Sequence, residues 1–380
     1  MSWDELPRQA SEWRAKGLWR ELREVKGRSG VVLTATDRRG VVSFASNDYL
    51  GLAASPWLAQ QLSQAALECG AGAGASRLIC GSHQPHHELE ERLALFKHSQ
   101  AALSFSSGYA TAMGVIPALV GRGDTVILDR LAHACLIDAT RLSGASLRVF
   151  AHQDLDKLES CLRRAQGRVL IVTESVFSMD GDLAPLREIV ELKNRYGAWL
   201  LLDEAHAVGV LGPEGRGLAA RESLSDQVEL QMGTMGKALG LSGGYVAASR
   251  QVIDWLVNRA RSAVFSTAPP PALARAACAV LGVVQSSEGQ RLRQRLFERM
   301  AQWSALSGIE PHSAIVPWGI GAEERAVSLA QSLQQDGLWV PAIRYPTVGR
   351  GEARLRISLS AAHEPSHLQD LWSALKRLTP

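Results

Sequence analysis

The residues best suited to chemistry begin just after an apolar run at 199–202. Asp203 and His206 follow that run directly. A buried carboxylate beside the ring nitrogen of a pyridine-type cofactor would keep that nitrogen protonated, because opposite charges at contact distance favour both charged forms. A histidine a few residues on could then reach the phenolic oxygen of the same ring. The plainer alternative is an aspartate that caps the next helix, with the histidine in its first turn.

A lysine lies in a glycine-rich segment further along the chain. The glycines around Lys237 are Gly233, Gly236, Gly240, Gly243 and Gly244. They allow the backbone to approach a flat ring and a phosphate. A lysine amine forms a Schiff base with the pyridoxal aldehyde, and Thr234 could place its hydroxyl on the phosphate. The segment therefore predicts attachment of pyridoxal phosphate (PLP) to Lys237, and the alternative is a surface lysine in a flexible loop.

A third segment, FSSGYATAMG, joins an apolar run at 101–105 to a predicted helix. Gly108 and Tyr109 lie where that helix would begin. A helix N-terminus offers unpaired N–H groups and the positive end of the helix dipole, which suits a phosphate. A plain strand-to-helix turn would have a similar sequence.

Two further polar groups follow apolar runs. His133 comes just after 125–129 and could stack on a pyridine ring, although a histidine there could equally be structural. Ser178 comes after 169–174, in a segment that also reads as a turn. CGAGAGAS (69–76) follows a predicted helix rather than a strand and lacks GxGxxG, so we interpret it as a flexible turn and not as a dinucleotide site.

These segments need a sheet to bring them together. Seven short apolar runs alternate with helical stretches, at 101–105, 125–129, 147–150, 169–174, 198–204, 229–233 and 244–249. Most lack polar alternation, which is typical of strands covered by helices on both faces of a mostly parallel sheet. Ligands of such sheets bind at the carboxyl ends of the strands. The pattern predicts an α/β fold with a site at that edge.

The ends of the chain predict additional structure. Residues 1–28 are expected to form an amphipathic helix, followed by a hairpin centred on Arg39–Gly40. Ser55 and Pro56 suit a helix start and Gly70 its stop. Strand-like segments at 338–343 and 354–360 indicate a smaller C-terminal α+β domain. The predicted divisions are an N-terminal segment (1–45), a large domain (46–265) and a small domain (266–380).

Composition narrows the class of protein. The 380 residues are 46% hydrophobic and 21% charged, with a formal net charge of +3, and we find no long basic run, so nucleic acid is a poor candidate partner. Neither a signal peptide nor a membrane span is predicted. The five cysteines are scattered without a CxxC, so neither a disulfide framework nor a zinc site is expected, and the cytoplasm fits best.

Several motifs, taken in order, resemble the α-oxoamine synthase family of fold-type I PLP-dependent enzymes. They are SNDYLGL (46–52), GAGASRLICGSH (72–83), LEERLA (89–94), TESVFSMDGDLAPL (173–186), LLDEAHAVGVLGPEGRG (201–217) and TMGKALGLSGG (234–244). The resemblance covers nearly the whole chain. It implies a PLP-dependent transferase fold of type I, a mostly parallel central sheet flanked by helices, and a homodimer.

The resemblance also implies roles for individual residues. Lys237 would carry PLP as a Schiff base and move protons, and Asp203 would pair with the ring nitrogen. The remaining cofactor contacts would come from Gly108, Tyr109, His133, Ser178, His206 and Thr234. Asn47 and Arg356 would bind the carboxylate of an amino acid, and Arg20, Arg344 and Thr347 would face an acyl substrate.

Within the family, MSW and the segment 342–364 are most similar to the members that join L-alanine to a pimeloyl thioester in biotin biosynthesis, with the acyl group on coenzyme A or a carrier protein. Tyr345, where many members have proline, is a departure. The main alternative is a sister enzyme that uses glycine, of the aminoketobutyrate ligase or aminolevulinate synthase type. A non-catalytic paralogue would have no need to keep Lys237 with Asp203 and His206, and an NAD-binding oxidoreductase would need the missing glycine fingerprint.

Overall fold

The computed structural model describes residues 3–16, 18–35 and 39–379. The chain forms two compact units. Unit 1 comprises residues 1–46, 299–359 and 363–380, and unit 2 comprises 47–298 and 360–362. These bounds differ from the predicted division into 1–45, 46–265 and 266–380. Both ends of the chain belong to one unit, and 266–298 belongs with the large central part.

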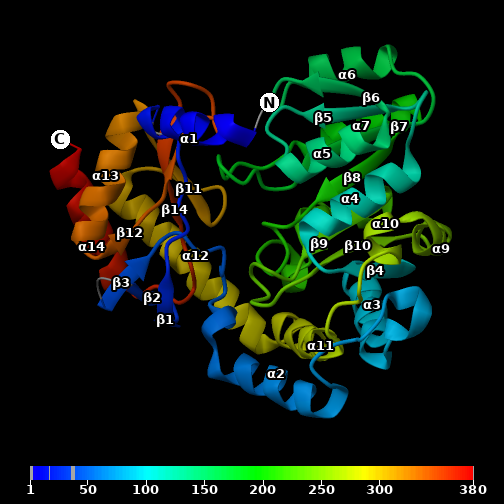
Figure 1. Ribbon diagram of the computed structural model, residues 1–380, viewed down its shortest axis with the longest axis horizontal. Coiled ribbons are helices and arrows are strands. Elements are labelled where there is room, and N and C mark those ends of the chain that lie inside the picture. Colours follow the sequence, from blue (N-terminus) through cyan, green and yellow to red (C-terminus); the bar gives the residue numbers. More distant parts are fainter. Residues whose placement is uncertain (1–2, 17, 36–38, 380) are drawn as a thin grey trace. The chain divides into compact units, whose positions relative to one another are not determined.

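Unit 2 is built on a seven-stranded sheet (Figure 1). Its strands are β4 (Ala101–Phe105), β5 (Thr125–Asp129), β6 (Ser146–Phe150), β7 (Val169–Glu174), β8 (Trp199–Asp203), β9 (Leu230–Thr234) and β10 (Gly244–Ala248). The order is β4-β10-β9-β8-β7-β5-β6. Only β10 runs antiparallel to its neighbours. The predicted mostly parallel sheet is confirmed, and each of the seven apolar runs forms a strand.

Helices cover both faces of this sheet, which explains why its strands are apolar throughout. Alternate residues of β8 point to opposite faces. Leu201 packs with α4 (Gly108–Leu119), α5 (Ala134–Ser143) and α9 (Arg250–Arg259). Leu200 and Leu202 pack on the other face with α6 (Leu155–Arg163) and α7 (Leu186–Tyr196). The polar groups that end the strands are therefore held in a rigid two-sided core.

The other helices of unit 2 include α2 (Pro56–Cys69), α3 (Gln84–Phe96) and α11 (Pro271–Gln285). The first follows Ser55 and stops before Gly70, which has a φ of +82° that favours glycine. The shorter helices are η2 (Leu52–Ala54), η3 (Arg77–Gly81), η4 (Pro213–Gly215), α8 (Leu218–Arg221), η5 (Ser225–Gln227) and α10 (Arg261–Val264). Because α11 packs on both α2 and α3, residues 266–298 belong to the large unit.

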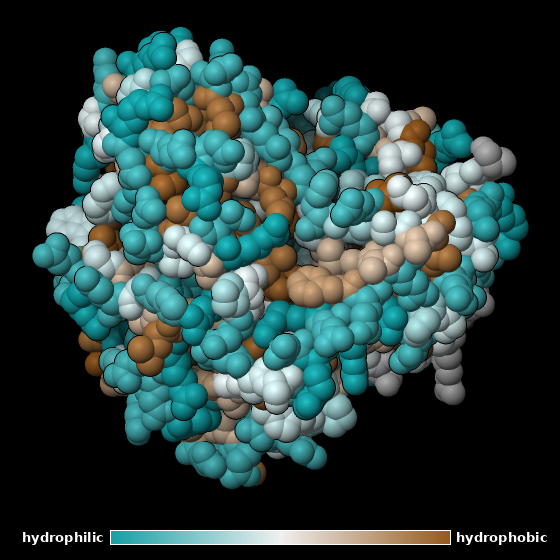
Figure 2. All heavy atoms as spheres, turned by 180° about the vertical axis from the view of Figure 1, so that it is seen from behind, coloured by the Kyte–Doolittle hydropathy of each residue, from teal (hydrophilic) through white to brown (hydrophobic). Residues whose placement is uncertain are grey.

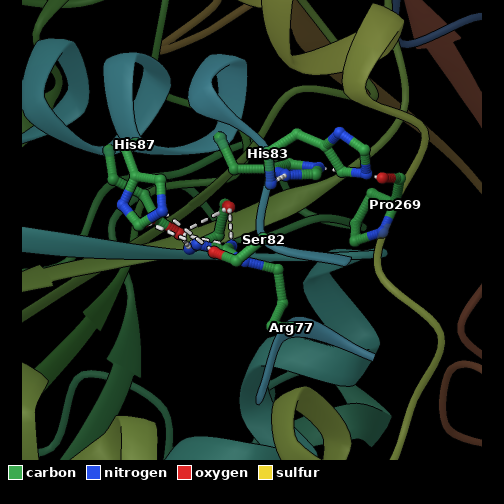
Figure 3. Close-up of polar contacts among 8 residues, drawn as sticks. Arg77, Ser82, His83, His87 and Pro269 are labelled. Atoms are coloured by element: carbon green, nitrogen blue, oxygen red, sulfur yellow. Dashed lines mark hydrogen bonds and ion pairs between the residues drawn. The ribbon is translucent and has the colours of Figure 1, made fainter. Parts of the chain in front are cut away.

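The segment predicted as a flexible turn at 69–76 leads into a short π-helical turn that is braced by side chains (Figure 3). Arg77 binds both carboxylate oxygens of Glu90, at 2.8 and 3.0 Å. Its Nε donates to Ser82 Oγ, which also lies 3.0 Å from Nε2 of His87. A bidentate arginine–carboxylate pair fixes orientation as well as distance. The segment is thus anchored to α3.

Unit 1 contains two small sheets. One has the order β1-β2-β3-β12, from β1 (Val25–Ser29), β2 (Val32–Ala35), β3 (Arg39–Ser43) and β12 (Leu338–Trp339). The other has the order β11-β14-β13, from β11 (Ile315–Gly321), β14 (Ala353–Ser358) and β13 (Ala342–Ile343). Its helices are η1 (Trp3–Glu5), α1 (Leu6–Ala15), α13 (Glu323–Gln335) and α14 (Pro365–Leu378), and α12 (Ser287–Ser307) enters it from unit 2.

The N-terminal predictions need correction. The helix expected over 1–28 ends with α1 at Ala15, and residues 18–24 are not helical. The apolar spacing beyond Ala15 is only roughly helical, and a glycine at position 17, outside the described residues, is a poor helix former. The hairpin is also shifted. Arg39 begins β3 instead of forming the turn, and the link from β2 runs through 36–38, which lie outside the described residues.

The C-terminal predictions are also only partly right. The strand-like run 338–343 divides into β12, which pairs with β3, and β13, which pairs with β14. Pro341 separates them because it has no N–H to give to a ladder. β11 was not predicted, because its proline and glycines weaken the strand signal. Trp303, Trp318 and Trp372 pack edge to face in this unit.

Most of the face seen in Figure 2 is hydrophilic, with hydrophobic atoms in separate clusters. None of the helices among residues 3–16, 18–35 and 39–379 has the length and apolar character to cross a membrane.

Candidate active site

A cavity of about 190 Å³ lies at the carboxyl ends of the central strands of unit 2. Its lining residues are Gly108, Tyr109, His133, Cys135, Glu174, Asp203, Ala205, His206, Met232, Thr234 and Lys237. Seven of the eight predicted cofactor residues are in this set, and they lie at or just after the ends of four strands, β4, β5, β8 and β9. A larger cavity of about 550 Å³, lined in part by Leu95 and Val257, contains no lysine and cannot form a Schiff base.

Two buried carboxylates lie in the cavity. Burial raises the pKa of Asp203, whereas the charge of Lys237 lowers it, and the backbone N–H of Ala205 donates to Asp203 Oδ1 at 2.9 Å. Burial, and then the charge of Asp203, raise the pKa of Glu174. Among the described residues, Glu174 Oε1 has no hydrogen-bond partner. A ligand with a protonated ring nitrogen would bring a positive charge to these two carboxyl groups and stabilise their ionised forms.

Lys237 and His206 are in direct contact. Nζ of Lys237 lies 2.8 Å from Nε2 of His206, across 31 residues of sequence. His206 is buried, and Lys237 follows β9 at the tip of a glycine-rich loop. The loop is closed by Thr234, whose hydroxyl donates to the carbonyl of Gly243 at 2.8 Å and accepts from Gly236 N–H at 3.1 Å. The amine is therefore presented to the cavity by a fixed turn.

His133 caps α5 and is held as a neutral ring. Its Nδ1 accepts from the backbone N–H of Cys135 at 3.2 Å and lies 3.0 Å from the Cys135 sulfur. Burial lowers the pKa of His133, although the charge of Asp203 opposes this. Burial raises the pKa of the Cys135 thiol, so the sulfur stays protonated. A neutral imidazole is suited to stacking on a ring.

The residues that the sequence predicts for a phosphate lie in the first turn of α4. Gly108 begins the helix and lines the cavity, and Ser107 caps it by accepting from Ala110 N–H at 3.0 Å. The hydroxyl of Tyr109 donates to Asp138 Oδ2 at 2.8 Å. Its backbone N–H lies in the first turn of α4, where helix N–H groups lack a partner within the helix and suit an anion. A Cβ on Gly244 would lie 2.5 Å from the Ser107 carbonyl oxygen and 2.6 Å from the Gly108 nitrogen. Only glycine at 244 permits this close approach.

Two predicted residues of unit 2 lie outside the cavity lining. Ser178 is buried four residues beyond the end of β7. Asn47 reaches the site through another residue, because its Oδ1 accepts from the hydroxyl of Tyr49 at 3.2 Å, and that hydroxyl lies 2.6 Å from Nδ1 of His206.

The predicted acyl-substrate residues come together in unit 1. Nη2 of Arg20 lies 3.4 Å from Oγ1 of Thr347, and Nη2 of Arg344 donates to the carbonyl of Trp19 at 3.3 Å. Arg20 lies beyond the end of α1, so its expected place on a helix is wrong. Arg356, also in unit 1, is buried on β14 and donates from Nη1 to Ser358 Oγ at 2.7 Å.

Three side chains that contribute polar contacts at the site, Glu174, Cys135 and Tyr49, were not predicted from the sequence. Glu174 ends β7, and a buried acidic residue at the carboxyl end of a strand was the signal that could have indicated it. Tyr49 gave no such signal, because its partner His206 lies 157 positions away. Cys135 contacts His133 two positions away, but a lone cysteine forms no motif that indicates a site. Among residues 3–16, 18–35 and 39–379, no cluster of histidine, cysteine and acidic side chains could hold a metal ion.

Comparison with known proteins agrees with this geometry. The sequence pattern of the aminotransferase class I and II family matches residues 39–375. The 8-amino-7-oxononanoate synthase of Geobacter sulfurreducens is 48% identical and aligns over 96% of this chain and 95% of its own length. That of Paraburkholderia xenovorans is 43% identical over 99% and 98% of the two chains.

Solved structures of related enzymes have a similar fold. A serine palmitoyltransferase from S. paucimobilis with bound PLP-myriocin aldimine has a TM-score of 0.90 at 28% identity, over 99% of this chain and 98% of that one. The 8-amino-7-oxononanoate synthase of Francisella tularensis has a TM-score of 0.76 at 26% identity, over 89% and 96%.

The chain belongs to the aminotransferase class I and II family of PLP-dependent enzymes. Within it, the chain is an acyl-transferring enzyme of the α-oxoamine synthase type, and its curated relatives named here are 8-amino-7-oxononanoate synthases. PLP is the cofactor, and the residues of the cavity fit it. They provide an amine for the aldehyde, buried carboxylates for a ring nitrogen and a helix N-terminus for the phosphate.

Proposed function

We propose that the protein condenses L-alanine with a pimeloyl thioester, with loss of carbon dioxide, to give 8-amino-7-oxononanoate. The relatives' name supports this, because that product is a nine-carbon chain. Its last two carbons carry the amino group and match alanine without its carboxylate. The other seven carbons, from the ketone to the terminal carboxylate, match a pimeloyl group. One C–C bond forms, and the C–S bond and the bond to the carboxylate break.

The contact between Lys237 and His206 beside Asp203 is the observation that carries the catalytic part of the proposal. PLP, when bound, supplies an electron sink for the bonds at the α-carbon of the amino acid. Asp203 would hold a proton on the ring nitrogen. Lys237 Nζ would take the proton from the α-carbon of alanine and return one to the product. His133 would stack on the ring, and Ser178 and His206 would bind its substituents.

The cluster of Arg20, Arg344 and Thr347 supports a polar-ended acyl chain. Guanidinium groups suit the oxygens of a carboxylate or ester. Asn47 and Arg356 would bind the alanine carboxylate. An enzyme that uses glycine remains the competing function, because one methyl group in a pocket changes binding by only about 1–3 kcal/mol.

We also propose a homodimer in the cytoplasm that takes its acyl group from coenzyme A or a carrier protein. Leu78, Ile79 and Leu95 expose 53, 79 and 75% of their surface in unit 2, which suits burial by a second copy. Five free thiols suit a reducing compartment. Light scattering would show twice the chain mass of 41.0 kDa for a dimer.

A product assay tests the substrates. The PLP-loaded protein is incubated with a pimeloyl thioester and with alanine, glycine or serine in turn, and the amino ketone is identified by mass. Alanine should give 8-amino-7-oxononanoate at the highest rate. A product one methylene smaller, formed faster from glycine, would replace the proposal with the sister function.

A further inference from the structure

A fully buried tyrosine contacts the edge of His206 that faces away from Lys237. The Tyr49 hydroxyl lies 2.6 Å from Nδ1 of His206, and Nε2 of the same ring lies 2.8 Å from Nζ of Lys237. The tyrosine has 0% and the histidine 5% of its surface exposed. With Asn47 Oδ1 at 3.2 Å from the hydroxyl, four side chains form one continuous chain from an amide to the reactive amine.

The amide of Asn47, at one end of this series of hydrogen bonds, sets the direction in which each hydrogen bond is donated. The amide oxygen of Asn47 can only accept, so the hydrogen of the Tyr49 hydroxyl is directed to it. The tyrosine oxygen is then left to accept a hydrogen bond from Nδ1–H of His206. A neutral imidazole carries one N–H, so its Nε2 has a lone pair that points at Lys237. Each group thus donates once, from the amine towards the amide.

We propose that Tyr49 is a positioning residue that holds His206 in the Nδ1–H tautomer and keeps the Nε2 lone pair directed at Lys237. In this state His206 can accept a proton from the Lys237 ammonium group at Nε2, which leaves a neutral amine and an imidazolium. The tyrosine oxygen continues to accept from Nδ1–H throughout. The inference goes beyond the proposed substrates and holds whichever amino acid is used.

Other ionisable groups act on the same amine. Asp203, Glu174 and His133 line the cavity with Lys237. Burial raises the pKa of both carboxyl groups, and whichever of them is ionised favours the ammonium form of Lys237. An acceptor at Nε2, 2.8 Å from Nζ, gives the ammonium group a place to deliver its proton. The tautomer of His206, which Tyr49 sets, decides whether that acceptor exists.

Nitrogen NMR on the PLP-free protein tests the tautomer directly. The protein is labelled with ¹⁵N-histidine, and His206 is assigned from the signals lost in His206→Gln. In the parent we expect Nδ1 to have the shift of an N–H nitrogen and Nε2 that of an unprotonated nitrogen. A parent protein with Nε2–H and a bare Nδ1 would overturn the proposal, and this measurement needs no folded variant at position 49.

Two variants then test whether Tyr49 sets the tautomer of His206. Tyr49→Phe removes only the hydroxyl and should convert His206 to a mixture with the Nε2–H form. Asn47→Leu keeps Tyr49 but removes the acceptor of its hydrogen, so the hydroxyl should turn to Nδ1 and favour the Nε2–H form. The matched control is Tyr245→Phe, since Tyr245 is also fully buried in unit 2 and its hydroxyl has no hydrogen-bond partner among the described residues.

The control should leave the His206 nitrogen shifts unchanged. A purely structural role for Tyr49 would lower stability in Tyr49→Phe and keep the Nδ1–H tautomer, and that result would refute the assignment. These spectra are recorded without PLP or substrates. Failure of the alanine and pimeloyl assay would therefore leave them unaffected.

Discussion

Nε2 of His206 lies 2.8 Å from Nζ of Lys237, although the two residues belong to segments that follow different strands. β8 and β9 are parallel neighbours, so the loops after them leave the same edge of the sheet. The contact joins a potential proton acceptor to the amine expected to bind PLP. The chemistry of the site depends on this pair.

Replacement of Lys237 should abolish covalent attachment of PLP. Borohydride reduction of the parent followed by peptide mapping should place the pyridoxyl group on Lys237. In Lys237→Ala the label should vanish, and the overall rate should fall by roughly 10²–10⁴-fold because the proton-transferring amine is lost. The exposed Lys157→Ala serves as control and should label normally. A label on another lysine in the parent protein would refute the assignment.

Asp203→Asn should impair chemistry more than cofactor binding. The amide has no charge to keep a ring nitrogen protonated, and removal of such an electrostatic partner typically costs about 10²–10³-fold in rate. Exchange of the alanine α-proton in deuterated water, followed by NMR, measures this step. Asp226→Asn, on the surface of η5, should exchange at the parental rate. Near-normal exchange in Asp203→Asn would leave the carboxylate a structural role only.

Arg20→Ala should raise the apparent KM for the pimeloyl thioester and leave the KM for alanine unchanged. Loss of a charged partner costs about 1.5–3 kcal/mol, or roughly a ten- to hundredfold change. Arg8→Ala is the matched control, since Arg8 is exposed on α1 and pairs only weakly with Glu12 at 3.8 Å. An unaltered pimeloyl KM in Arg20→Ala would argue against this acyl group.

His152 should stabilise the fold in a pH-dependent way. Its Nδ1 lies 3.0 Å from Asp129 Oδ1 and its Nε2 lies 2.7 Å from Asp182 Oδ2. Burial lowers the pKa of His152, but the two carboxylates outweigh this and raise it to about 10. A raised pKa contributes stability that is complete below the unfolded value of 6.5 and is lost as the pH rises through 10.

His152→Ala should therefore lower the free energy of unfolding by about 1.5–3 kcal/mol near neutral pH. The difference from the parent should shrink as the pH rises from about 6.5 to about 10 and be smallest above that range. Urea unfolding at several pH values measures it, with the exposed His312→Ala as control. A difference that does not change with pH would mean that packing against Phe177, and not charge, is what His152 contributes.

Gly244→Ala should destabilise unit 2 and weaken PLP binding. The added Cβ would meet backbone atoms of Ser107 and Gly108, which cannot move without shifting the start of α4. Overpacking of this kind costs about 1–3 kcal/mol. Gly282→Ala, in α11 with nothing within 4 Å of the added Cβ, should instead be neutral or stabilising by up to about 1 kcal/mol. Equal stability of the two variants would contradict the steric argument.

The sequence by itself determined the seven strands of unit 2 and the position of the reactive groups at their carboxyl ends. Apolar runs such as 169–174 have no polar alternation, and burial on both faces of a sheet follows from that local property. The roles expected for Lys237 and Asp203 came from residue type and local context in the same way. These are short-range features, which a sequence expresses directly.

The tertiary structure alone decided which side chains touch. Tyr49 lies 157 positions from His206, and no local pattern encodes that hydrogen bond. The grouping of both chain ends into unit 1 and the pairing of β12 with β3 likewise join segments far apart in sequence. Helix ends such as Ala15 were misjudged because weak amphipathic spacing continues past them. Contacts of this kind arise from packing of whole elements, which periodicity and residue type do not specify.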